Sequence, residues 1–381
     1  MQLNQHKKDI KQFPIVFSLI FSVMFTACMD DDLLSEYNDL DVEEDTSLVS
    51  IIQKQAGVFI VNEGNFMYEN SSLSYYLADS MKVLNSIFFR TNDVPLGDVA
   101  HSITIRDSLA YIVVNNSAKV YVINITNFKY RGKITGLTSP RYIHFVNDSK
   151  AYITDLYAKA IAIVNPMSFE ITGKIDVNNH ESEYYQHPTE QMVQYGNYVF
   201  TNCWSYDNKI LVIDTRLDEV VDSIEVLKQP TSLVLDKNNK IWTLTDGGFA
   251  GNPYANERPG LIKIDAASRK IEKTFYFEKG DRPLEVALNG AKDTLYFVNK
   301  DVYRMSINDP GLPSEALIET NGIISSIGID PYSSDIYLGD AIDNVQQGVI
   351  FRYGATGAAI DTFKAGIIPG HFAFRPARES R

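Results

Sequence analysis

The chain repeats one pattern six times between residues 102 and 364. Each copy opens with a short alternating strand, passes a polar turn into a strand rich in Tyr, Val and Ile, and adds two further strands. The copies are Ser102–Gly136, Tyr142–Val177, Glu190–Val226, Ser232–Phe277, Leu284–Glu319 and Ser325–Lys364. A period of roughly 20 to 50 residues marks a solenoid, a propeller or another array of stacked units.

The two ends of the repeated region complete each other. Residues 57–91 contain three strands without an opening strand, and residues 371–375 form an opening strand without a sequel. The strand at residues 371–375 and the three strands at residues 57–91 together predict a seventh four-stranded unit. We therefore expect an all-β fold, a seven-bladed β-propeller over residues 51–376, closed by pairing of the C-terminal strand with N-terminal strands. A β-sandwich would not explain the matching units or the split terminal one.

Composition supports this interpretation. The chain has 22 Tyr and 20 Phe, which favour strands, and almost no helix is expected. Proline lacks a donor and suits the start of a strand; it precedes several opening strands, at Pro140, Pro188, Pro230, Pro283 and Pro369. A net charge of −13 argues against a nucleic-acid partner, because binding phosphates requires clustered Lys and Arg.

The first residues indicate export. Three lysines precede an apolar stretch over residues 13–25, which is too short to cross a bilayer and typical of a secretory signal. Thr26 and Ala27 before Cys28 resemble a bacterial lipobox, so we expect residues 1–27 to be a lipoprotein signal peptide and Cys28 to be lipidated. An ordinary secretory signal with an incidental cysteine is the alternative.

Residues 28–50 hold nine acidic and no basic side chains, which predicts an extended tether. Its acidic start resembles the export signal of Bacteroidetes surface lipoproteins; a solvated linker is the alternative. We expect an outer-membrane protein held by its lipid anchor and facing the extracellular side, with residues 377–381 as a tail. Cys203, the only other cysteine, is expected to be buried rather than reactive.

A ligand is expected on one face of the ring. In a propeller, the loops from the second to the third strand of a blade and from the fourth strand to the next blade emerge together around the channel mouth. The candidate ligand-binding residues in these loops are Asn65, Phe66, Tyr68, His101, Arg141, Tyr157, Tyr185, His187, Trp204, Tyr206, Phe249, Tyr254 and Arg282. Aromatic and amide side chains together suit a flat, amphipathic, largely uncharged ligand, although turns and β-proteins in general also use these residue types.

Motifs for catalysis are absent. The chain has no GxSxG, HExxH or Walker sequence, so we expect a protein that is not an enzyme and has no cofactor or metal. His180 and His187 share one loop, which leaves a zinc site open, and calcium in a loop rich in Asp and Asn is also open.

The phrase GVFIVNEGN at residues 57–65 and the strand-turn pattern over residues 57–375 resemble the YncE-like seven-bladed propellers and, among Bacteroidetes surface lipoproteins, the cobalamin-binding BtuG-type proteins. The resemblance implies capture of cobalamin or another bulky nutrient and its delivery to a TonB-dependent outer-membrane transporter. Two alternatives are an interaction propeller without a small ligand and a lactonase-like hydrolase.

Overall fold

The computed structural model describes residues 46–179, 187–248, 251 and 256–377. The expected signal peptide, Cys28 and most of the acidic tether lie outside these residues, as do Tyr185, Phe249 and Tyr254. Among the helices of the described part, none is long and apolar enough to cross a membrane.

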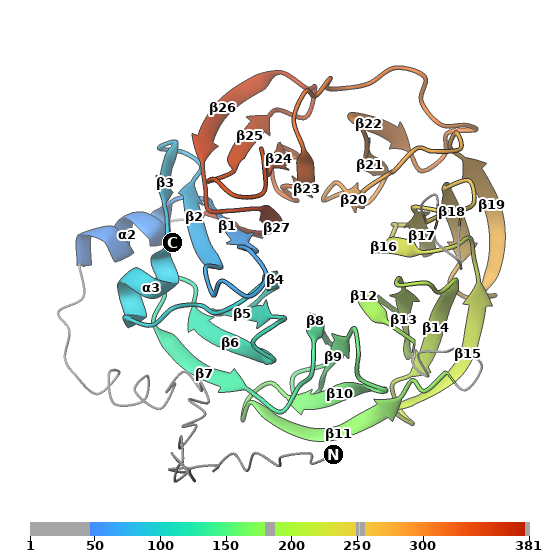
Figure 1. The fold of residues 1–381 in the computed structure, drawn as a ribbon, viewed down its shortest axis with the longest axis horizontal. Coiled ribbons are helices and arrows are strands. Elements are labelled where there is room, and N and C mark those ends of the chain that lie inside the picture. Colours follow the sequence, from blue (N-terminus) through green and yellow to red (C-terminus); the bar gives the residue numbers. More distant parts are fainter. Residues whose placement is uncertain (1–45, 180–186, 249–250, 252–255, 378–381) are drawn as a thin grey trace, which may run out of the picture.

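Seven antiparallel sheets are arranged in a ring around a central axis, with the first strand of each sheet innermost (Figure 1). The seven-bladed β-propeller predicted from the repeats is confirmed. In the first blade, β27 (Pro369–Arg375) lies beside β1 (Gly57–Asn62), and Phe372 is opposite Ile60. The two chain ends therefore close the ring within one sheet, as the split terminal unit predicted.

The strands follow the repeats in order. Blade 1 is completed by β2 (Ser72–Leu77) and β3 (Lys82–Leu84). Blade 2 contains β4 (Ala100–Arg106), β5 (Leu109–Val114), β6 (Lys119–Asn124) and β7 (Tyr130–Ile134). Blade 3 contains β8 (Pro140–Phe145), β9 (Ala151–Asp155), β10 (Ala160–Asn165) and β11 (Glu170–Asp176). Blade 4 contains β12 (Thr189–Tyr195), β13 (Tyr198–Cys203), β14 (Lys209–Asp214) and β15 (Glu219–Glu225).

The remaining blades complete the ring. Blade 5 contains β16 (Pro230–Leu235), β17 (Lys240–Thr245), β18 (Gly260–Asp265) and β19 (Lys270–Tyr276). Blade 6 contains β20 (Val286–Leu288), β21 (Thr294–Asn299) and β22 (Asp301–Ser306). Blade 7 contains β23 (Ile324–Ile329), β24 (Ile336–Asp340), β25 (Val349–Tyr353) and β26 (Ala359–Lys364).

Blade 6 departs from the expected four strands. The segment near Glu315–Glu319 makes only an isolated bridge between Val302 and Ile318 and does not form a fourth strand. Pro310 and Pro313 precede it, and proline cannot donate to a strand ladder. The edge of this blade is therefore closed by a loop.

Two short helices lie beside blade 1, α2 (Thr46–Lys54) and α3 (Ile87–Asn92). Over the residues that the structure describes, the near absence of helix predicted from the sequence is otherwise confirmed. Helix α2 includes residues 46–50, which the sequence assigned to the tether. Ile52 of α2 is 1% exposed, so this helix contributes to the core.

The hydrophobic core consists of seven clusters, each between two neighbouring blades. Because side chains alternate across a strand, each sheet presents one apolar face to the preceding blade and one to the next. Strand β1 is accordingly buried along its whole length. At the closure, the ring of Phe372 lies against Gly328, where a Cβ atom would come within 2.7 Å of it.

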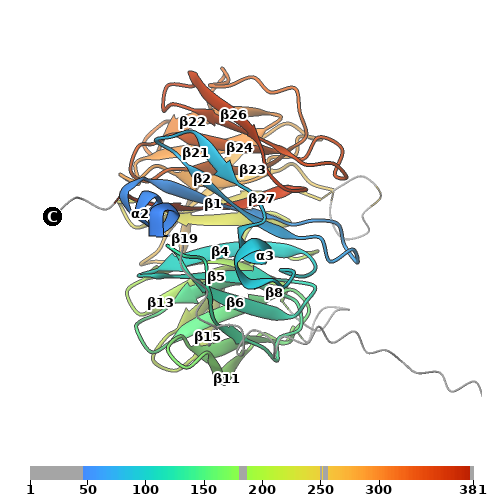
Figure 2. The ribbon, with the colours of Figure 1, turned by 90° about the vertical axis from the view of Figure 1, so that its left-hand side faces the viewer.

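Viewed from the side, the ring has α2 near one face and the β1–β2 loop near the opposite face (Figure 2). Contacts agree with this view, since Arg375 at the end of β27 donates to the carbonyl of Gln55 just after α2. The described chain therefore enters the propeller on the face opposite the β1–β2 loop.

Candidate functional site

The two expected kinds of loop share one face of the ring. The side chain of Asn65 in the β1–β2 loop donates to the carbonyl of Asn344 in the β24–β25 loop, at 2.5 Å. Asp98, which precedes β4, accepts from the backbone of Met67 at 2.8 Å and from the side chain of Asn116 at 2.5 Å. These contacts tie loops of blades 1, 2 and 7 together. We call this surface the loop face.

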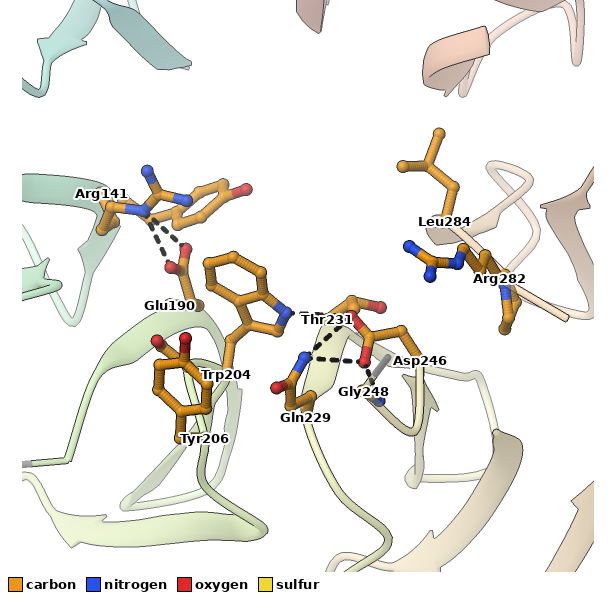
Figure 3. A pocket seen from close by; sticks show the side chains of 13 residues that line it. Arg141, Glu190, Trp204, Tyr206, Gln229, Thr231, Asp246, Gly248, Arg282 and Leu284 are labelled. Carbon is orange, nitrogen blue, oxygen red and sulfur yellow. Dashed lines mark hydrogen bonds and ion pairs between the residues drawn. The ribbon is translucent and has the colours of Figure 1, made fainter. Parts of the chain in front are cut away.

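The loop face contains a cavity of about 430 Å³ at the side of the channel mouth formed by blades 3 to 6 (Figure 3). Its lining residues are Arg141, Tyr142, Glu190, Trp204, Ser205, Tyr206, Gln229, Thr231, Asp246, Gly248, Arg282, Pro283 and Leu284. The volume lies within the range of roughly 300 to 1,000 Å³ that is usual for small-molecule sites.

An ion pair lies on the channel side of the cavity. Nε of Arg141 on β8 donates to both carboxylate oxygens of Glu190 on β12, at 2.8 and 2.9 Å. The side chains are 15% and 4% exposed. Burial raises the pKa of Glu190, and Arg141 opposes that shift. The pair joins blades 3 and 4 and fixes the guanidinium beside the cavity.

A second polar network forms the opposite wall. Asp246, directly after β17, accepts from Nε1 of Trp204 at 3.3 Å and from Nε2 of Gln229 at 2.9 Å. The backbone of Gly248 also donates to it, at 2.8 Å. These contacts hold the Trp204 indole in place as a wall of the cavity, with its polar edge satisfied and its ring available for stacking.

Arg282 lies across the cavity from Trp204 (Figure 3). Its side chain is exposed and makes no hydrogen bond or ion pair with the residues that the structure describes. The cavity thus combines two arginines with Glu190 and Asp246, and its formal charge balances. Such a lining favours a ligand with little net charge that carries polar groups at its edge.

Beneath the cavity, ionisable side chains line the central channel. Burial raises the pKa of Glu63, and Arg141 opposes that shift. Burial lowers the pKa of His101, whose Nε2 lies 3.8 Å from Glu190, well below its usual value. Burial also lowers the pKa of His371 to about 4. The two histidines are therefore neutral at pH 7.

A further cavity of about 330 Å³ lies along the channel. It is lined by Thr104, Tyr142, Ile143, His144, Gln191, Met192, Leu233 and His371. Nearby, Glu285 accepts a hydrogen bond from Gln191 at 3.1 Å, and burial raises its pKa to about 7. The channel is thus lined by polar side chains, of which the histidines are neutral and the carboxyls of Glu190 and Glu285 accept hydrogen bonds.

Four predicted residues meet in the first cavity, Arg141, Trp204, Tyr206 and Arg282. His101 and Arg141 do not lie in loops as expected. They are the second residues of β4 and β8, because these inner strands begin two residues earlier than the repeats predicted, at Ala100 and Pro140. Their side chains therefore lie by the channel and are fixed by strand pairing.

The remaining predicted residues that the structure describes lie outside this cavity. Asn65, Phe66 and Tyr68 belong to the β1–β2 loop and do not line the cavity; Phe66 and Tyr68 are 64% and 75% exposed. Tyr157, after β9, is 64% exposed and likewise stands outside the cavity. His187 contacts Asp207 behind the loop that carries Trp204.

Several lining residues were not predicted. Glu190 and Tyr142 each follow a strand-opening proline by two residues, Pro188 and Pro140, a position that faces the channel. The spacing of two residues after such a proline could therefore have identified both residues from the sequence. Gln229 and Asp246 had no comparable signal, because their role depends on the position of Trp204 in a neighbouring blade.

The sequence of the chain matches one protein family. Residues 56–360 match DUF5074, a domain of unknown function. The chain belongs to this family. No functionally curated protein matches the chain.

Among solved structures, similar folds include a quinonprotein alcohol dehydrogenase-like protein from Bacteroides thetaiotaomicron, 14% identical over 85% of this chain and 78% of that one, with a TM-score of 0.65. A putative 6-phosphogluconolactonase from Bacteroides fragilis is 11% identical over 84% and 98%, with a TM-score of 0.62. Apo AztD from Citrobacter koseri is 12% identical over 84% and 98%, with a TM-score of 0.55. At such identities the likeness concerns the fold alone.

Proposed function

We propose that this DUF5074 protein is a surface lipoprotein that captures a bulky amphipathic nutrient, with cobalamin or a related corrinoid as the leading candidate, and passes it to a TonB-dependent outer-membrane transporter. The observation that carries the proposal is the charge-balanced cavity on the loop face, with Trp204 and Tyr206 on one side and Arg282 on the other. The sequence resemblance to cobalamin-binding propellers supports the choice of ligand.

The chemistry of the cavity suits a corrinoid. A corrin ring is broad and carries amide side chains around its edge, so it needs an aromatic contact surface and polar partners at its rim. Trp204 offers the first, and Gln229 and Asp246 offer the second. The exposed guanidinium of Arg282 can bind the phosphodiester of the nucleotide arm. A ligand of this size would fill the cavity and extend over the loop face.

The position of the described N-terminus supports attachment to a membrane. Helix α2, with which the described chain begins, lies on the face opposite the β1–β2 loop (Figure 2), so a membrane on the side of Thr46 would lie away from the loop face. The exposed side chains of Phe66, Met67 and Tyr68, at 64 to 75%, offer an apolar contact on that face for a transporter or for the protruding part of a ligand.

Isothermal titration calorimetry of the purified full chain with cyanocobalamin tests the proposal. We expect saturable binding, and Trp204→Ala should weaken it by about 30-fold, the loss of about 2 kcal/mol typical of an aromatic contact that dominates binding. Tyr276→Ala is the matched control, because Tyr276 is an exposed aromatic on the outer strand β19. Absence of heat at micromolar protein and ligand would reject cobalamin as the ligand.

A hydrolase is the second candidate, because an acid–base cluster lies beside the cavity. Burial raises the pKa values of Glu63 and Glu190, Arg141 interacts with both carboxyls, and His101 is neutral near Glu190. Such perturbed groups can exchange a proton with a bound ester or lactone. Hydrolysis of sugar lactones by the purified chain, lost in Glu190→Gln, would favour this function over capture.

A further inference from the structure

Three potential metal ligands converge behind the Trp204 loop. His187 lies just before β12, Cys203 is the last residue of β13, and Asp207 lies in the β13–β14 loop. One donor atom from each lies within 4.8 Å of the other two. Cys203 is 0% exposed, and the side chains of His187 and Asp207 are 17% and 9% exposed. None of the three lines the cavity of the loop face.

The backbone holds these residues in place. The amide of His187 donates to the carbonyl of Val177 at 2.9 Å, and the carbonyl of Asp207 accepts from the amide of Gln229 at 2.8 Å. The amide of Trp204, next to Cys203, donates to Pro188, next to His187, at 3.0 Å. Neighbouring residues on two segments are thus linked directly. The donor set is therefore built on fixed backbone positions and not on long flexible side chains.

The separations suit a four-coordinate transition metal. In a tetrahedral site with Zn–S near 2.3 Å and Zn–N or Zn–O near 2.1 Å, two ligands of one zinc ion stand about 3.4 to 3.6 Å apart. The donor atoms here lie up to 4.8 Å apart, so rotation of the side chains would bring the most distant pair closer by about 1 Å on binding. Nδ1 of His187 and Oδ2 of Asp207 are hydrogen-bonded at 2.6 Å, which is closer than two zinc ligands stand, so this hydrogen bond would open on binding.

We propose that His187, Cys203 and Asp207 form a binding site for a divalent transition metal, with Zn²⁺ as the best match and water as the fourth ligand. A thiolate and an imidazole select a borderline-soft ion over Ca²⁺ and Mg²⁺, which require oxygen ligands. The site differs from the zinc pair His180 and His187 that the sequence left open, because Cys203 and Asp207 supply the other ligands.

Binding of the metal ion releases one proton, from the thiol of Cys203. Burial, followed by the nearby Asp207 carboxylate, raises the pKa of the Cys203 thiol well above its usual value, so the metal displaces the thiol proton to solvent as the metal–sulfur bond forms. In the loaded site, the two positive charges of the metal ion are then balanced by the thiolate of Cys203 and the carboxylate of Asp207.

The site would also organise the cavity wall. Cys203 and Asp207 flank Trp204 and Tyr206, so an ion bound by both ends closes that short loop. Metal binding should therefore change the fluorescence of Trp204. The second tryptophan, Trp242, is fully buried in another cluster and serves as an internal reference.

The test uses the purified full chain after removal of metal with a chelator. We expect titration with Co²⁺ to give a thiolate-to-cobalt charge-transfer band that saturates at one ion per chain, and Zn²⁺ to displace it. Cys203→Ser should abolish the band, and His187→Gln and Asp207→Asn should each weaken Zn²⁺ binding by more than about tenfold, since even changes outside the ligand shell reach that size.

Cys28→Ser is the matched control, because Cys28 is the only other cysteine of the chain, and the change should leave the band unchanged. Thermal unfolding without metal establishes whether each variant folds. If Cys203→Ser does not fold, His187→Gln and Asp207→Asn still test the proposal. Absence of the band, a band that survives in Cys203→Ser, or equal Zn²⁺ affinity in all variants would overturn the proposal. Each result is independent of ligand binding in the cavity.

Discussion

Replacing Glu285 by Gln should stabilise the protein, and by more at high pH than at low pH. Glu285 lies directly before β20, the inner strand of blade 6. Gln191 donates to it at 3.1 Å, and burial raises its pKa from 4.5 to about 7. The folded protein holds this carboxyl protonated at pH values where the unfolded chain has already released the proton. Stability therefore falls as pH rises from about 4.5 to 7, and above pH 7 the folded state carries a buried carboxylate.

The size of the effect follows from the two pKa values. At about 1.4 kcal/mol per pH unit, the gap between 4.5 and about 7 corresponds to an upper limit of about 3.5 kcal/mol above pH 7. About 2.5 kcal/mol of this develops between pH 5 and pH 8. Glutamine removes the titration and keeps an oxygen that can accept from Gln191. Channel water would reduce these values, but it would not change their sign.

Urea unfolding at pH 5 and pH 8 measures the difference between the original chain and Glu285→Gln at each pH. Subtraction at fixed pH removes the contribution of the other carboxylates. Glu315→Gln is the matched control, because it makes the same chemical change at an exposed position. The reasoning is refuted if Glu285→Gln has the same effect at both pH values or is less stable than the original chain at pH 8.

Three further substitutions test the fold. Phe372→Ala removes a buried ring from the closing strand and should cost about 3 to 5 kcal/mol in chemical unfolding; a cost below about 1 kcal/mol would contradict ring closure by β27. Asp335→Ala removes the carboxylate that accepts from the largely buried guanidinium of Arg352 at 2.7 Å, and among the described residues only the neutral acceptors of Ala78 and Tyr76 remain. This change should cost about 3 kcal/mol by the same measurement, whereas no change would show the pair to be dispensable. Asp236→Ala orphans Nε1 of Trp242, bonded at 2.8 Å, and should lower the melting temperature by several degrees, with about 1 to 3 kcal/mol lost.

The architecture could be predicted because its signals are local. Each repeat carries its own alternation and turns, and the strand at residues 371–375 has the pattern of the opening strand missing before Gly57. The prediction was wrong where local signals were weak, as in the missing fourth strand near Ile318. Two prolines upstream outweighed a short run of apolar residues there.

The candidate site was predictable only in part. Trp204 and Arg282 were found because they stand in loops of the expected face, and the structure brings both to one cavity. Glu190 was missed, although its place two residues after Pro188 puts it on an inner strand. Arg141 and Glu190 are 49 residues apart in sequence, so their ion pair has no local signature.

By itself, the sequence determined how many sheets there are, their strand order and the way the two ends meet. Each repeat contains its own alternation of apolar and polar residues and its own turn residues, so these features do not depend on distant segments. Only the tertiary structure decided which side chains share a cavity, a channel or a potential metal site. Arg141, Glu190, Trp204, Asp246 and Arg282 belong to four blades, and their distances depend on how tightly seven wedge-shaped sheets pack around one axis. That packing is a property of the closed ring and of no single segment.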